Sequence, residues 1–165
     1  MAATELLSFA KARDLLDYCH ETGVIQWRAS IGTARAGNVA GCIGRDGYRE
    51  IKISGITYRA HRLAWLHFYG EWPKQCIDHI NGIRTDNRIV NLRDVPKSTN
   101  SQNLRKVRPN NKSTGLLGAY PQNRRWIAKI RVAGRQIHIG TFDTPEAAHA
   151  AYVEEKRRSH IGCTI

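Results

Sequence analysis

The chain has 165 residues, of which 41% are hydrophobic and 24% are charged, and its formal net charge is +12. This composition excludes a wholly disordered chain, and the length accommodates one ordinary domain or two small ones. The strong positive charge favours a polyanionic partner.

The positive charge is concentrated in the last third of the chain. Residues 105–165 hold 12 basic and 4 acidic side chains (12 − 4 = +8), whereas residues 1–104 hold 14 and 10 (14 − 10 = +4). The C-terminal part is therefore expected to bind the polyanion. The four scattered cysteines include no C-x-x-C pair, which argues against a zinc site and favours reduced thiols.

The first half of the chain predicts short elements of alternating type. Leucines at roughly helical spacing predict the first helix, and Ser54-Gly55 between two alternating runs predicts a hairpin. No apolar run is long enough for a signal peptide or a membrane span, so no membrane association is expected. In chain order we expect a helix over 5–19, a strand at 24–27, a hairpin of 48–53 and 56–60, and a helix over 61–69 ended by Gly70.

The second half predicts a strand–loop–strand–helix unit and then a second small domain. The polar, basic stretch 105–114 contains a proline and is the expected linker. Thr144 and Pro145 are typical of a helix start. The expected elements are strands at 76–80 and 91–95, a helix from Ser98, three strands within 115–142, and a helix from Pro145.

The chemistry is concentrated in one window of the sequence, residues 78–100. Asp78 and His79 are adjacent, and Asn91 and Asn100 follow. Imidazole is the side chain best suited to deprotonate a water near neutral pH, and hard cations prefer carboxylate and amide oxygens. Neighbours on a strand point to opposite faces, so we expect the strand to end and the chain to bend at this pair.

A lone Asp-His dipeptide rarely has a catalytic meaning, so the interpretation depends on the longer pattern. The run HRLAW…GEWP…IDHINGIRTDNRIVNLRDVPKSTNSQN resembles the HNH endonucleases, in particular their phage and intron-homing branch. The resemblance implies a ββα-metal site. His79 would be the general base, Asp78 a metal ligand, and Asn91 the residue that bridges the loop. Asn100 would be the second metal ligand, with Asn103 as the alternative, and Arg93 could neutralise charge on the phosphate.

The C-terminal stretch resembles the plant ethylene-response-factor (APETALA-type) DNA-binding domain, most specifically in GTFDTPEAA. In that family the sheet contacts DNA. Lys129 and Arg131 are predicted on the sheet face opposite the helix. Tyr120 and His138 stand where the plant domains often have Arg and Trp. The resemblance therefore implies affinity for DNA phosphates but does not imply the base specificity of the plant domains. The expected DNA-binding residues are Tyr120, Arg124, Arg125, Lys129, Arg131, Arg135 and His138.

These observations predict an α+β protein: an HNH module over 1–104 with its core at about 58–103, then the linker, then a three-stranded antiparallel sheet packed on one helix over 115–165. The expected activity is a Mg²⁺- or Mn²⁺-dependent endonuclease acting on double-stranded DNA, without a small-molecule cofactor. It would be a monomer or a DNA-assembled dimer in the cytoplasm of a bacterial or phage-infected cell. The alternative is a catalytically silent DNA-binding transcriptional regulator. RNA binding has no supporting pattern of stacking aromatics.

Overall fold

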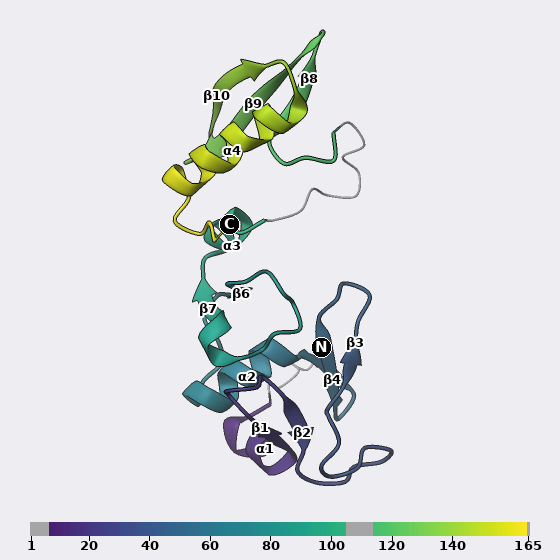
Figure 1. Ribbon diagram of the computed structural model, residues 1–165. Coiled ribbons are helices and arrows are strands. Elements are labelled where there is room, and N and C mark those ends of the chain that lie inside the picture. Colours follow the sequence, from purple (N-terminus) through teal and green to yellow (C-terminus); the bar gives the residue numbers. More distant parts are fainter. Residues whose placement is uncertain (1–6, 105–113, 165) are drawn as a thin grey trace, which may run out of the picture. The chain divides into compact units, whose positions relative to one another are not determined.

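The structure is a computed structural model that describes residues 7–104 and 114–164. The chain divides into two compact units, which we call unit 1 (Met1–Val95) and unit 2 (Pro96–Ile165). Within the described residues the molecule has four α-helices and several small antiparallel sheets, so it is an α+β protein (Figure 1). Nearly all of the predicted linker, residues 105–113, lies outside the described residues.

Over residues 7–95, unit 1 contains three small antiparallel sheets, formed by β1-β2, β3-β4-β5 and β6-β7. Its elements are α1 (Phe9–Leu15), β1 (Leu16–Tyr18), β2 (Ile25–Trp27), β3 (Cys42–Ile43), β4 (Arg49–Ile53), β5 (Ile56–Arg59), α2 (Ala60–Tyr69), β6 (Cys76–His79), the 3-10 helix η1 (Ile89–Asn91) and β7 (Leu92–Val95).

The core of unit 1 forms around α2. Leu63 and Leu66 are at most 1% exposed and belong to one apolar cluster with Ile51 of β4 and Ile77 of β6. Burying a side chain of this size stabilises the fold by roughly 1.5–3 kcal/mol. The helix ends where predicted, because Gly70 adopts a φ of 78° and its N–H donates to the Leu66 carbonyl at 2.9 Å.

The predicted hairpin is confirmed, and the predicted first helix is too long. Ser54 and Gly55 both have positive φ, at 49° and 84°, which is the conformation of a two-residue hairpin turn. The first helix ends at Leu15, and its predicted residues 5 and 6 lie outside the described residues. The chain changes to a strand there because Leu16, fully buried, pairs with Trp27 of β2.

Unit 2 is built on one antiparallel sheet in the order β10-β9-β8, and α4 packs on it. Ala148 of α4 forms a cluster with Ala119 and Ala128, and all three are 0% exposed, so the helix lies close to the strands. Thr144 caps α4 as predicted, because its side chain accepts from the Ala147 N–H at 3.2 Å. The elements are α3 (Lys97–Gln102), β8 (Ala119–Gln122), β9 (Arg125–Val132), β10 (Arg135–Phe142) and α4 (Pro145–Ser159).

The boundary between the units falls after Val95, whereas the sequence suggested the segment 105–114. The difference arises because α3 contacts residues beyond α4: the Gly162 N–H donates to Gln102 Oε1 at 2.9 Å. The four cysteines are free thiols. Over residues 7–104 and 114–164, no helix combines the length and the apolar character needed to span a membrane.

Candidate active site

His79 is the last residue of β6 and is only 4% exposed. In the pairing of β6 with β7 it stands opposite Leu92. The chain turns directly afterwards, because the Gly82 N–H donates to the His79 carbonyl at 2.8 Å. The imidazole therefore lies at the bend that the sequence predicted for this pair.

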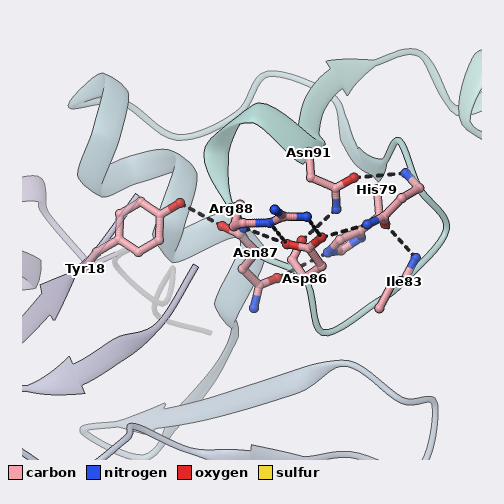
Figure 2. A network of polar contacts seen from close by, with 8 residues as sticks. Tyr18, His79, Ile83, Asp86, Asn87, Arg88 and Asn91 are labelled. Atoms are coloured by element: carbon pink, nitrogen blue, oxygen red, sulfur yellow. Dashed lines mark hydrogen bonds and ion pairs between the residues drawn. The ribbon is translucent and has the colours of Figure 1, made fainter. Parts of the chain in front are cut away.

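Asn87 holds the His79 ring in place. His79 Nε2 lies 3.2 Å from Asn87 Oδ1, and because an amide oxygen only accepts, Nε2–H is the donor. Asn87 is 2% exposed, and its backbone carbonyl accepts a hydrogen bond from the Tyr18 hydroxyl at 2.7 Å. Burial raises the pKa of Tyr18, which keeps this hydroxyl a donor. Strand β1 thus supports the residue that orients the imidazole (Figure 2).

Hydrogen bonds made by the side chains of Asp86 and Asn91 stabilise the loop over residues 80–91. Asn91 Oδ1 accepts from the Asn81 N–H at 2.9 Å, and its Nδ2 donates to the Asp86 carbonyl at 2.8 Å. The Asp86 carboxylate accepts from Asn81 Nδ2 and from the Arg88 guanidinium. Its hydrogen bonds with Arg88 lower the pKa of Asp86 to about 2, so it stays ionised. Figure 2 shows this network around the loop.

Two aromatic side chains pack against the His79 ring. His61 of α2 lies edge-on to it with 5.2 Å between ring centroids, and Tyr48 lies 5.7 Å away. Tyr48 also contacts His61 at 5.1 Å and carries the Arg84 guanidinium over its ring at 5.0 Å. His61 therefore belongs to the surroundings of His79.

Burial keeps both imidazoles neutral near pH 7. It lowers the pKa of His79, although the hydrogen bond with Asn87 acts in the opposite direction. It lowers the pKa of His61 to about 3, and the neighbouring His79 adds to this effect. A neutral imidazole held by a donated hydrogen bond can accept a proton, which is what a general base requires.

Asp78 and Arg93 form an ion pair across β6 and β7. Arg93 donates to Asp78 Oδ2 from Nε at 2.9 Å and from its terminal nitrogen at 2.7 Å. The Asp78 side chain is 7% exposed and that of Arg93 is 25% exposed. Arg93 thus orients the carboxylate in this structure, and its predicted contact with a phosphate remains a prediction.

Asn100 and Asn103 belong to unit 2. Asn100 lies on α3 and is half-buried, and Asn103 caps the C-terminal end of that helix and is 7% exposed. The predicted pairing of Asp78 with Asn100 at one cation therefore remains a prediction. Among the described residues no group of three or more His, Cys, Asp or Glu side chains could hold a metal ion. The proposed ligand pair, a carboxylate and an amide oxygen, is chemically suited to a hard cation.

The strand register in unit 2 places most of the predicted DNA-binding residues on one face. Lys129 of β9 pairs with His138 of β10, Arg131 pairs with Gln136, and Tyr120 of β8 pairs with Ile127. Because paired residues share a face, these side chains lie on one side of the sheet.

The opposite side of that sheet carries Trp126 and Ala128, which pack against α4. Arg125 is exposed but forms an ion pair with Asp143 at 2.9 Å. Arg124 and Arg135 are exposed at the turns. Ile127, on the same side as Lys129, is 4% exposed, so the central strand β9 presents a buried apolar residue beside basic ones on this face.

Comparison with protein families identifies the segment around His79. Residues 58–102 match the family model described as HNH endonuclease. This segment of the chain is similar to the HNH endonucleases. The match supports nuclease activity on DNA, and HNH nucleases generally use a divalent metal.

One curated protein resembles a larger part of the chain. It is an ethylene-responsive transcription factor-like protein of Arabidopsis thaliana, 29% identical over 94 residues, which are 57% of this chain. The matched region covers only 38% of that relative. No solved structure matches the chain significantly.

Within and around the matched segment, the sequence pattern gave no role to several contributors to the site, among them Asn87, Tyr18 and Tyr48. Asn87 lies inside the motif, but nothing in the pattern distinguishes it from the other polar residues of the loop. Tyr18 and Tyr48 come from strands and turns that precede the matched segment, so only the folded chain brings them to His79.

Proposed function

We propose that this protein is a metal-dependent endonuclease of the phage or homing type, which hydrolyses phosphodiester bonds in duplex DNA. The observation that carries the proposal is a buried, neutral imidazole, His79, at the end of a strand in the HNH domain and hydrogen-bonded through Nε2 to Asn87. A catalytically silent regulator would not need an imidazole oriented in this way.

His79 would act as the general base through its second ring nitrogen. Because Nε2 carries the proton donated to Asn87, Nδ1 is the nitrogen that can accept a proton from water. The water oxygen then attacks phosphorus, and the bond to the 3′ oxygen breaks. The lowered pKa of His79 keeps the imidazole in the accepting form at neutral pH.

Asp78 and Asn100 would hold Mg²⁺ or Mn²⁺ through their side-chain oxygens. When bound, such a cation supplies positive charge to the phosphate oxygens and to the leaving oxygen. Arg93 contributes by fixing the orientation of the Asp78 carboxylate. Asn91 contributes by closing the loop that carries Asn87.

Unit 2 would position the nuclease on DNA through the sheet face that carries Tyr120, Lys129, Arg131 and His138. Cationic side chains on a sheet bind phosphates independently of sequence, and a sheet of this size fits the major groove. The similarity to a transcription factor-like protein is consistent with this role. A monomer with one HNH site would nick one strand, and a dimer assembled on DNA could cut both.

The test is cleavage of supercoiled plasmid with Mg²⁺ or Mn²⁺, beside an EDTA control. The wild-type protein should produce open-circle or linear DNA only with the cation. His79→Ala should lose this activity and retain its DNA affinity, whereas His20→Ala, which removes an exposed imidazole, should cleave normally. Tight binding without cleavage across several cations and sequences would instead identify a DNA-binding regulator.

A further inference from the structure

Helix α3 has little stability of its own. It has six residues, KSTNSQ, and neither a side-chain cap nor an acidic residue in its first turn. Ser, Thr and Asn are weak helix formers, and isolated helices much shorter than about 12 residues do not persist in water. Since none of its residues is fully buried, contacts with other segments must hold this helix in place.

Contacts with α3 and the residues just after it come from the last turns of α4 and from the chain that follows α4. The Gly162 N–H donates to Gln102 Oε1 at 2.9 Å, and the Thr164 hydroxyl donates to Asn103 Oδ1. Lys156 of α4 donates from Nζ to the Leu104 carbonyl at 2.5 Å. We call Lys156, Gly162 and Thr164 the C-terminal clasp.

The clasp is close-packed. Lys156 is 1% exposed, and a charged amine this deep is tolerated only when it is paired or hydrogen-bonded. A Cβ added at Gly162 would lie 2.3 Å from the Thr99 carbonyl oxygen and 3.1 Å from Gln102 Cβ. The backbone of Gly162 therefore lies against α3 with no room for a side chain. Figure 1 shows the chain after α4 returning to α3.

We propose that the C-terminal clasp positions Asn100 for the nuclease reaction by holding α3 in place. This inference rests on the proposed role of Asn100 as a cation ligand. The residues of the clasp are positioning residues, because they contact α3 and the residues just after it and would act on the cation site through that helix.

Gly162→Ala is the sharpest test, because the added Cβ would collide with the Thr99 carbonyl of α3. Its φ lies outside the left-handed range, so alanine is compatible with the backbone. In the full-length protein we expect faster hydrogen exchange of the peptide spanning 97–104. We also expect Mn²⁺ affinity and nicking to fall about tenfold or more, as when supporting partners of a metal ligand are removed. DNA affinity measured in EDTA should change less than twofold.

The control is Ile161→Ala, which removes a side chain that is 92% exposed in the same tail and should match the wild type in every measurement. Gln102→Leu provides a milder second variant, because it keeps the volume and loses the acceptor for Gly162, and it should show the same changes to a smaller degree. Unchanged exchange and Mn²⁺ affinity in both variants would overturn the proposal. Faster exchange with unchanged Mn²⁺ affinity would also overturn it, since α3 would then not carry the ligand.

If the wild-type protein neither binds Mn²⁺ nor nicks DNA, the proposed function fails and the positioning role fails with it. Exchange at 97–104 would still decide whether the clasp holds α3. If the clasp variants bind Mn²⁺ and nick DNA like the wild type while His79→Ala loses cleavage, the nuclease assignment stands. The clasp is then dispensable for the reaction. The two failures are therefore distinguishable.

Discussion

Asp78 and His79 are neighbours in one strand, yet their side chains have different surroundings. Asp78 accepts two hydrogen bonds from the guanidinium of Arg93. His79 is surrounded by Asn87, His61 and Tyr48. The alternation of a strand separates the carboxylate from the imidazole, so each can be tuned by its own partners. This arrangement suits a site in which one group binds a cation and the other moves a proton.

The buried His61 predicts a loss of stability in mild acid. Its pKa is about 3 in the folded protein and about 6.5 when unfolded, so between these values the unfolded chain binds the additional proton. The contribution of the neutral His61 to the free energy of unfolding is fully present above about pH 6.5. It is lost as the pH falls towards 3, with a slope of up to about 1.4 kcal/mol per pH unit. His61→Phe should flatten the pH dependence of the unfolding free energy, measured by urea titration from pH 4.5 to 7.5. An equal slope in His61→Phe and wild type would contradict the assignment.

At the scale of elements, the turn between β1 and β2 supports the loop that carries Asn87. Gly23 in this turn has a φ of 75°, and a Cβ there would lie 2.5 Å from the Arg88 backbone nitrogen and 2.6 Å from the Asn87 carbonyl carbon. The backbone of the turn therefore lies directly against the segment that orients His79. Any side chain at this position must displace either the turn or the loop.

Gly23→Ala should consequently reduce plasmid nicking by tenfold or more and lower the unfolding free energy by roughly 1–3 kcal/mol, the range for strain and overpacking. Gly32→Ala is the matched control, because its φ is also positive, at 57°, but nothing lies within 4 Å of the added Cβ. Backbone strain should destabilise Gly32→Ala by a similar amount, whereas its plasmid nicking should stay at the wild-type level. Equal nicking by the two variants would show that the turn does not support the loop.

The elements that could be predicted from sequence are those whose determinants are local. The Ser54-Gly55 turn, the Gly70 helix end and the Thr144 cap depend on a few consecutive residues, and all three are found in the structure. The hydrogen bond from Tyr18 to Asn87 joins residues 69 positions apart, so no local pattern indicates it. The change from helix to strand at Leu16 was missed for the same reason, since the pairing with Trp27 decides it.

At the scale of the whole molecule, the net charge of +12 predicts that the proposed affinity for DNA falls as the salt concentration rises. Lys129 and Arg131 lie on the sheet face proposed to contact phosphates. Replacing both with alanine should weaken DNA binding and reduce the slope of log affinity against log salt concentration by roughly 1–2. Titrations by fluorescence anisotropy in EDTA at several salt concentrations measure this slope. An unchanged slope would remove this face from the DNA interface.

The hydrogen bond between Gly162 and Gln102 joins residues 60 positions apart, with the whole sheet of unit 2 between them. Ribosomes add about 5–20 residues per second, so Gln102 is synthesised about 3–12 s before its partner. During that interval β6 and β7 can already pair, whereas α3 still lacks the tail that fastens it. If the protein is the proposed nuclease, its nascent chain would therefore lack a fastened α3 until the C-terminal unit had been made.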